Sequence, residues 1–228
     1  MTAQVGGASP LLPRVDMQER RRKHADERRR LRRLRRELPA DVRRDAERRI
    51  AATLRRLGLA APGRVVAVYL AMDGEVDLGP YFRLARRAGA RLYAPRIIHR
   101  RRRAIRFVPL PDDAALTRNR FGIAEPADAP AHGLPPHRID AVIAPLVGFD
   151  PRGYRLGMGG GYYDRALRTR LAGRSTWRRP RIVGVAFACQ EVRGYEVAPW
   201  DVPLDLVVTE RGVLRPTPAT REDKGSTR

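Results

Sequence analysis

The apolar residues in the first part of the chain are spaced as in amphipathic helices. Residues 17–38 are strongly basic, and their few leucines recur at steps of three and four, which predicts a helix with a narrow apolar stripe. Pro39 interrupts this pattern, and Asp41 is a candidate N-cap for a second helix that Gly58 would end. The leucines of the first stripe are Leu31, Leu34 and Leu38, and the core face of the second helix would be Val42, Ala46, Ile50, Leu54 and Leu57.

Short apolar runs alternate with helical patterns over the rest of the chain. The run at 65–69, which is rich in β-branched residues, has the length and composition of a buried strand. Strands that alternate with helices indicate an α/β fold, here a three-layer sandwich with a mostly parallel sheet, whose ligands bind at the carboxyl ends of the strands. The expected strands are residues 64–70, 91–94, 105–108, 141–144, 182–187 and 206–209, and further helices are expected at 77–88 and 162–171.

The remaining segments have the composition of loops and tails. Residues 109–138 are rich in Pro, Ala and Asp, and we expect them to form a long loop that is functional or mobile. Residues 1–16 and 215–228 are expected to be disordered tails on either side of one domain, residues 17–214.

Length and composition exclude several classes of protein. A chain of 228 residues suffices for one α/β domain with a buried core. We expect a cytoplasmic protein without a membrane span, because no apolar run reaches the length of such a span and the N-terminus lacks the apolar core of a signal peptide. The single cysteine, Cys189, excludes an internal disulfide and a multi-cysteine metal site, and we expect it to be a small buried residue rather than a reactive thiol.

The formal net charge of +22 comes almost entirely from arginine. Arginine can bind nucleic-acid phosphates, but here it is spread along the whole chain, which favours its use as the general surface cation. We therefore expect no specific nucleic-acid partner. Either interpretation favours anionic ligands.

The most informative segment is glycine-rich and lies between an expected strand and an expected helix. It contains Gly157, Gly159, Gly160 and Gly161 in five residues. Glycines in such a position allow backbone N–H groups to approach phosphates. Two flanking side chains have fitting chemistry: Arg155 can pair with phosphate oxygens, and Asp164 can ligate a magnesium ion.

Two familiar phosphate-binding motifs are excluded. A Walker A loop requires Gly-Lys-Ser/Thr after its glycines, and a dinucleotide-binding fingerprint requires a glycine where Tyr162 stands. The alternative is a tight strand-to-helix connection in which Asp164 only complements the helix dipole. The density of glycines, together with Arg155 and Asp164, favours phosphate binding.

The string PLVGFDPRGYRLGMGGGYYDR at 145–165 resembles the signature of the 5-formyltetrahydrofolate cyclo-ligase family. Weaker similarities extend over about residues 23–210, in the family's order: VYLAMDGEVDL at 68–78, RNRFGIAEP at 118–126, CQEV at 189–192 and WDVPLDLVVTE at 200–210. The resemblance implies a NagB/RpiA-like sandwich, in which the glycine loop and a basic N-terminal helix hold ATP.

The resemblance also implies roles for single residues. The residues that match ATP-binding positions are Arg28, Arg155, Leu156, Gly157, Met158, Gly159, Gly160, Gly161, Tyr162 and Tyr163. Where the family often has Lys or Arg, this chain has His24, with Lys23 adjacent as a replacement. The folate-binding positions correspond to Leu70, Glu75 and residues 158–162, and the magnesium positions correspond to Asp164 and Asp201.

The implied reaction needs no nucleophile from the protein. In it the formyl oxygen of 5-formyltetrahydrofolate attacks the γ-phosphate of ATP, and N10 then displaces phosphate as the ring closes to 5,10-methenyltetrahydrofolate. Positioning and charge neutralisation suffice for such a phosphoryl transfer, in agreement with the absence of a Ser/His/Asp or Cys/His constellation from the sequence. We expect a monomer.

Four residues also have simpler interpretations. Glu75 could be a solvated loop residue, Tyr162 and Tyr163 could pack against the sheet edge, and Asp201 could be a turn residue. For the whole chain, the alternatives are a nucleic-acid-binding protein that uses the Arg-rich helix, and a protein that keeps the fold without the activity. The glycine loop argues against the first, and the presence of Arg155, Asp164 and Asp201 argues against the second.

Overall fold

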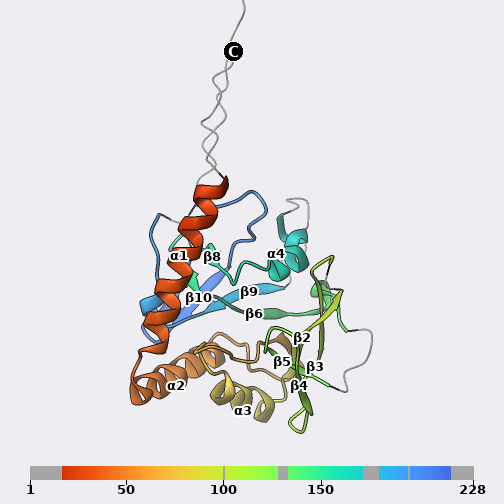
Figure 1. The fold of residues 1–228 in the computed structure, drawn as a ribbon. Coiled ribbons are helices and arrows are strands. Elements are labelled where there is room, and N and C mark those ends of the chain that lie inside the picture. Colours follow the sequence, from red (N-terminus) through yellow and green to blue (C-terminus); the bar gives the residue numbers. More distant parts are fainter. Residues whose placement is uncertain (1–16, 100, 128–132, 172–179, 195, 217–228) are drawn as a thin grey trace, which may run out of the picture.

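The chain forms a seven-stranded, mostly parallel sheet between helices (Figure 1). This computed structural model describes residues 17–99, 101–127, 133–171, 180–194 and 196–216. The strand order is β11-β10-β9-β6-β1-β2-β3, in which the five central strands run parallel and the two edge strands, β3 and β11, pair antiparallel with their neighbours. The strands are β1 (Val65–Ala67), β2 (Arg91–His99), β3 (Ala104–Pro109), β6 (Ala141–Pro145), β9 (Arg181–Val185), β10 (Leu206–Thr209) and β11 (Gly212–Leu214).

Helices cover both faces of this sheet. Helices α2 (Ala40–Arg56) and α3 (Gly79–Arg87) lie on one face, and α4 (Tyr162–Leu167) lies on the other (Figure 1). Each face carries its own apolar cluster, because successive side chains of a strand point to opposite sides. Val66 packs with the α2 and α3 side chains, whereas Val65 belongs to the cluster that includes Leu167 of α4. The expected three-layer α/β fold is confirmed, and a NagB/RpiA-like relationship stays a prediction.

Helix α1 (Met17–Arg36) is the expected basic N-terminal helix. Leu31 anchors it in a third apolar cluster with Val147, Leu156 and Val192, and Leu34 packs against that cluster. The narrow apolar stripe expected from the sequence therefore holds α1 against the segment that leads into the glycine loop.

Two details of the second helix differ from the expectation. Its N-cap is Pro39, and Asp41 lies in the first turn without capping the helix through its side chain. A proline with φ near −55° and an extended ψ already directs the chain into the helix, so the aspartate complements the helix dipole instead. Val42 is 48% exposed and does not belong to the core face. Gly58 follows the helix with φ 74°, as expected.

The stretch from 109 to 138 contains more structure than the expected loop. It forms a hairpin of β4 (Leu116–Arg118) and β5 (Ala124–Pro126) and a 3₁₀ turn, η1 (Pro136–Arg138), while residues 128–132 lie outside the described residues. All of β4 is exposed, so the hydrophobic pattern carried no strand signal there. The hairpin turn is held by Asn119, whose Oδ1 accepts hydrogen bonds from the Phe121 and Ile123 amides.

Other boundaries differ slightly. Strand β2 extends to His99, five residues further than expected, and the edge strand β11 was not expected. Helix α4 ends at Leu167 and continues as the 3₁₀ helix η2 (Arg168–Leu171). The expected tail at 1–16 and residues 217–228 of the expected tail at 215–228 lie outside the described residues, whereas Arg215 and Pro216 are described and have no regular secondary structure. Within the described part of the chain, no helix has both the length and the hydropathy that a membrane crossing requires.

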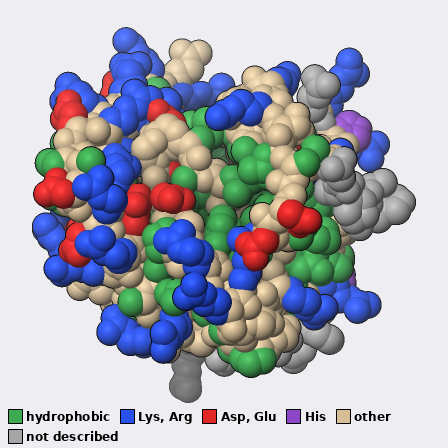
Figure 2. Space-filling view, turned by 90° about the horizontal axis from the view of Figure 1, so that it is seen from below, with side chains coloured by type: hydrophobic (Ala, Val, Ile, Leu, Met, Phe, Trp, Pro, Cys, Tyr) green, Lys and Arg blue, Asp and Glu red, His purple; other side chains and the backbone are tan. Residues whose placement is uncertain are grey.

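The basic side chains are dispersed over the face that the space-filling view shows (Figure 2). In Figure 2, which shows the molecule from below, Lys and Arg side chains are distributed around the whole outline with acidic side chains among them. This distribution agrees with arginine as the general surface cation; the absence of a specific nucleic-acid partner stays a prediction.

Candidate functional site

The glycine-rich segment forms a loop between a short β-ribbon and α4. Strands β7 (Gly148–Phe149) and β8 (Arg155–Leu156) pair antiparallel directly after β6, and α4 starts at Tyr162. Gly159 and Gly161 have φ values of 89° and 65°, which disfavour residues with a side chain. An added Cβ at Gly157 would meet no atom within 4 Å, so the backbone is open on that side. The loop has the shape expected of a backbone that a ligand approaches closely.

Helix α1 contacts this loop through Arg28. Its Nε donates a 2.7 Å hydrogen bond to the Gly157 carbonyl oxygen, and its Cζ would lie 3.6 Å from a Cβ added at Gly159. The structure therefore brings together the basic helix and the glycine loop, which are separated by more than 100 residues in the sequence. The guanidinium group of Arg28 thus holds the backbone of the glycine loop through the Gly157 carbonyl oxygen.

The two residues at the variable family position lie one turn before Arg28. Lys23 is 61% exposed and pairs with Glu19 of its own helix at 2.8 Å, which raises its pKa. The pKa of His24 is lowered by burial and by the positive charges of Arg20 and Arg28. A neutral imidazole binds phosphate more weakly than an ammonium group does, so Lys23 is the better candidate for a phosphate contact.

Arg155 is buried and holds two segments together. Its side chain is 4% exposed, its Nη1 donates to the Val202 carbonyl oxygen at 2.8 Å, and its Nη2 lies 2.5 Å from Asp164 Oδ1. The same Asp164 oxygen accepts the Val202 amide at 3.2 Å. Asp164 thus binds the peptide unit that directly follows Asp201, so the two expected magnesium ligands belong to adjoining parts of one site.

Asp201 lies at the other side of this junction. Its Oδ2 accepts the Ala198 amide at 2.8 Å and lies 3.9 Å from an Arg20 nitrogen on α1. The hydrogen bond within the turn is also what a purely structural aspartate would form. The Arg20 contact places the turn beside the same face of α1 that reaches the glycine loop.

Asp164 and Asp201 suit a metal ion that is bound jointly by protein carboxylates and by the phosphates of a ligand. They suit an ion that is bound by protein side chains alone less well. The described residues contain no group of three or more His, Cys, Asp and Glu side chains arranged to hold a metal. Magnesium is commonly bound by one or two carboxylates together with substrate phosphates and water. Asp164 and Asp201, whose side chains are 26% and 16% exposed, match this requirement in chemistry, number and access.

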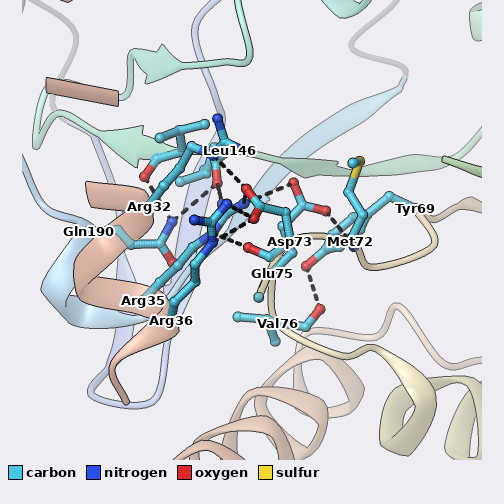
Figure 3. A network of polar contacts seen from close by, with 12 residues as sticks. Arg32, Arg35, Arg36, Tyr69, Met72, Asp73, Glu75, Val76, Leu146 and Gln190 are labelled. Atoms are coloured by element: carbon cyan, nitrogen blue, oxygen red, sulfur yellow. Dashed lines mark hydrogen bonds and ion pairs between the residues drawn. The ribbon is translucent and has the colours of Figure 1, made fainter. Parts of the chain in front are cut away.

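Glu75 lies in a tight turn at the carboxyl end of β1 and is buried, so its interpretation as a solvated loop residue is wrong (Figure 3). Its side chain is 7% exposed, Oε1 lies 3.9 Å from an Arg35 nitrogen, and Oε2 accepts the Met72 amide at 3.2 Å. Burial raises the pKa of Glu75 to about 7, against the opposing effect of Arg35. Glu75 is therefore held in place by protein contacts on both carboxylate oxygens.

The turn with Glu75 is close to the residues that follow the glycine loop. The negative charge of Glu75 adds to the burial that raises the pKa of Tyr163, so these two side chains interact electrostatically. Leu70, at the start of the same segment, is partly buried and packs against the apolar cluster of α2 and α3. Both expected segments are contacted by α1, because Arg35 lies 3.9 Å from Glu75 and Arg28 donates to Gly157, and both follow the carboxyl ends of parallel strands.

Tyr162 and Tyr163 pack against the apolar cluster beneath α4 while remaining partly exposed. The Tyr162 ring also meets Phe121 edge-to-face, at a centroid distance of 6.3 Å and an angle of 75°. Sequence reasoning did not single out Phe121. A hollow of about 640 Å³ lies beside it, within the size range of small-molecule sites. The residues that line it are Ile97, Ile98, His99, Arg101, Asn119, Arg120, Phe121 and Glu125.

Sequence reasoning also missed the group that holds the Glu75 turn. Asp73 binds three arginines of α1, which are spaced as on one helix face: Arg32, Arg35 and Arg36 (Figure 3). Two signals in the sequence pointed to it. The Asp73-Gly74 dipeptide is typical of a tight turn, and the arginines follow Arg28 at steps of four, seven and eight.

Known proteins are similar to this chain in sequence. A family model described as 5-formyltetrahydrofolate cyclo-ligase family matches residues 20–210. The 5-formyltetrahydrofolate cyclo-ligase of Escherichia coli (strain K12) is 40% identical over 146 residues, which are 63% of this chain and 76% of the relative. The enzyme of the same name from Haemophilus influenzae is 34% identical over 146 residues, 63% of this chain and 74% of the relative.

Solved structures agree as well. An NMR structure of Aquifex aeolicus 5,10-methenyltetrahydrofolate synthetase superposes with a TM-score of 0.69 at 30% identity, over 90% of this chain and 96% of the other. The 5,10-methenyltetrahydrofolate synthetase of Mycoplasma pneumoniae gives a TM-score of 0.62 at 24% identity, over 82% of this chain and 98% of the other, and supports the fold. With a family model that spans most of its length, this chain belongs to the 5-formyltetrahydrofolate cyclo-ligase family.

Proposed function

We propose that this protein converts 5-formyltetrahydrofolate to 5,10-methenyltetrahydrofolate, with ATP as co-substrate and with release of ADP and phosphate. One observation supports the proposal most strongly. The basic helix, the glycine loop and the segment that follows Asp201 meet through Arg28, Gly157, Arg155 and Asp164, although they come from distant parts of the sequence. This convergence produces a site with backbone donors, positive charge and carboxylates together.

The glycine loop and α1 would bind the ATP phosphates. Backbone N–H groups of residues 157–161 are candidate donors, and at Gly157 an added Cβ would meet no other atom within 4 Å. An anion among the arginines of α1 is stabilised by their charge. The proposed ATP contacts are Lys23, His24, Arg28, Arg155, Leu156, Gly157, Met158, Gly159, Gly160, Gly161, Tyr162 and Tyr163. Because its guanidinium group is buried, Arg155 would act mainly by holding Asp164 and the Val202 peptide in place.

Asp164 and Asp201 would hold a magnesium ion that accompanies ATP. Such an ion neutralises charge on the phosphates during phosphoryl transfer. In this chain the carboxylate of Asp164 is oriented by Arg155 and by the Val202 amide, and that of Asp201 by the Ala198 amide. Asp164 is thus oriented through Oδ1 and Asp201 through Oδ2 before the ion arrives.

The folate would lie between the Glu75 turn and the glycine loop. Proposed contacts are Leu70, Glu75, Met158, Gly159, Gly160, Gly161 and Tyr162. The formyl oxygen attacks the γ-phosphorus, ADP leaves, N10 attacks the phosphorylated formyl carbon, and phosphate departs as the ring closes. The protein has to supply geometry and charge balance, and no covalent step involves one of its side chains.

The direct test is product formation by the purified protein. 5-Formyltetrahydrofolate is incubated with ATP and magnesium, and the products are separated by chromatography and compared with authentic 5,10-methenyltetrahydrofolate. Omission of ATP or chelation of the metal should each abolish product. Product that forms equally well without ATP would refute the proposed role of the glycine loop, and no product under any condition would refute the function.

A further inference from the structure

The Asp73–Gly74 turn at the carboxyl end of β1 has an unusual backbone. Asp73 has φ 51° and Gly74 has φ 75°, and the Glu75 amide donates a 2.9 Å hydrogen bond to the Met72 carbonyl oxygen. These are the features of a primed β-turn, for which Asp-Gly is a preferred pair. A left-handed aspartate costs on the order of 1–3 kcal/mol and persists only where its surroundings determine it. Here the surroundings are supplied by α1.

Three guanidinium groups converge on the Asp73 carboxylate (Figure 3). Arg32 Nε lies 2.5 Å and Arg35 Nη2 lies 3.3 Å from Oδ2, while Arg36 binds Oδ1, with its Nε at 2.6 Å. The Asp73 side chain is 12% exposed and that of Arg35 is fully buried. A carboxylate that is removed from water in this way needs its cationic partners, so the turn cannot leave α1 without exposing several unpaired charges.

The backbone of the turn is held in addition to its side chain. Arg35 Nε donates to the Asp73 carbonyl oxygen at 3.0 Å, and Arg43 Nη1 of α2 donates to that of Gly74 at 2.9 Å. A Cβ added at Gly74 would lie 3.3 Å from the Arg36 Cγ, so the turn lies close against the helix. Arginines of α1 and α2 therefore hold the backbone of the turn in place against α1.

The same helix face holds the glycine loop. Arg28 contacts Gly157, and Arg32 and Arg35 follow it by one and two helical turns, a distance of about 10 Å along the axis. Arg35 also donates to the Leu146 carbonyl oxygen at 3.3 Å, directly before the β-ribbon that leads into the glycine loop. One rigid element thus sets the separation between the loop and the turn.

We propose that Asp73 is a positioning residue for the cyclo-ligase reaction, whose carboxylate locks the Met72–Glu75 turn onto α1 and so places Glu75 opposite the glycine loop. Asp73 does not touch the substrate in this scheme; it acts through Glu75. The inference rests on the proposed function. It predicts that loss of the Asp73 charge weakens the use of folate far more than the use of ATP, because the contact between Arg28 and the glycine loop stays in place.

The test compares Asp73→Asn with the wild-type protein and with Asp45→Asn. Asparagine tolerates the left-handed backbone and has the same shape, so this variant removes the charge alone. Asp45 is an exposed carboxylate that pairs with Arg48 and Arg49 of its own helix, at 3.4 Å and 2.6 Å, and links no two elements. We expect Asp73→Asn to raise the KM for 5-formyltetrahydrofolate by about tenfold or more and that for ATP by less than about threefold, and Asp45→Asn to change neither.

A double-variant cycle shows whether Asp73 acts through α1. Arg32→Gln removes one partner of Asp73, and the combined Arg32→Gln/Asp73→Asn variant should raise the folate KM by less than the product of the single effects. If wild-type protein forms product and Asp73→Asn keeps a wild-type folate KM, the inference is wrong while the proposed function stands. The inference would also be overturned if Asp73→Asn raised the KM values for folate and ATP equally. The same holds if the double variant raised the folate KM by the full product of the two single-variant increases. A wild-type protein that forms no product would refute the proposed function, and this inference with it.

Discussion

Gly157 lies where an added methyl group would touch no other part of the protein. No atom is found within 4 Å of a Cβ built there, and its φ lies outside the left-handed region. If ATP phosphates approach the loop backbone, that methyl group projects into space that the ligand requires. Gly157→Ala should therefore weaken the use of ATP without lowering the stability of the protein.

The expected magnitudes follow from the geometry. An alanine that fits without strain stabilises a protein by about 0.4–1 kcal/mol through the unfolded chain. For a chain of this length that corresponds to a melting temperature that is unchanged or about 1–4 °C higher. A methyl group that keeps phosphate oxygens from their backbone donors should lower kcat/KM for ATP by about tenfold or more, since one lost donor of this kind costs about 10²–10³ in transition-state stabilisation.

Gly58→Ala is the matched control. Gly58 also has open space around its Cβ, but its φ of 74° ends α2 far from the site in the sequence. The left-handed backbone should cost an alanine about 1 kcal/mol, and so lower the melting temperature by about 2–4 °C while the KM for ATP stays the same. Differential scanning fluorimetry and steady-state kinetics on the same preparations measure both quantities.

The two variants should therefore show opposite patterns. A Gly157→Ala protein with wild-type KM and kcat would refute the close approach of phosphate to the loop at this residue. A Gly157→Ala protein that loses activity together with several degrees of melting temperature would refute the geometric argument, because the structure offers no contact that the methyl group could disturb.

Three further predictions concern side chains. Arg28→Ala should raise the KM for ATP, whereas Arg29→Ala, at an exposed residue that pairs within its own helix, should not. Asp201→Asn should lower kcat by about tenfold or more with a melting temperature within about 2 °C of the wild-type value, since the amide oxygen can still accept the turn hydrogen bond; a normal kcat would remove this residue from the metal site. Glu75→Gln should alter the pH dependence of stability. Because the pKa of Glu75 rises from 4.5 to about 7 on folding, wild-type stability falls as the pH increases through this interval. The free energy of unfolding of the variant should exceed that of wild type by up to about 3 kcal/mol at pH 8 and should equal it below pH 4. Urea denaturation in which the variant and the wild type have the same midpoint at pH 8 would contradict this.

The sequence predicted most of the framework because the signals there are local. Buried β-branched runs mark the central strands, and leucine spacing marks α1. The exposed hairpin strand β4 and the edge strand β11 were not predicted, since neither has a buried face that alternates along the strand. Local hydrophobic patterns therefore predict helices and strands that have a buried face, and they do not predict strands that are exposed.

The site was predicted unevenly for a related reason. The glycine loop was identified from its glycines and flanking charges, and Arg28 was identified through the family resemblance; the structure places the two in contact. The partners of Arg155 and Asp73 could not be read from the sequence, because ion pairs between distant segments depend on how helices dock. An arginine in a chain with a net charge of +22 carries no signal of its own, so only the fold distinguishes the buried Arg35 from its exposed neighbours.

The most direct test of the function is the stoichiometry of the reaction. Formation of the methenyl product is followed by its absorbance while ADP and phosphate are measured in the same samples, with the wild-type protein, 5-formyltetrahydrofolate, ATP and magnesium. We predict that methenyl product, ADP and phosphate form in equal amounts, and that none forms when folate or ATP is left out. Methenyl product without matching ADP, or ATP hydrolysis that continues unchanged without folate, would contradict the assignment.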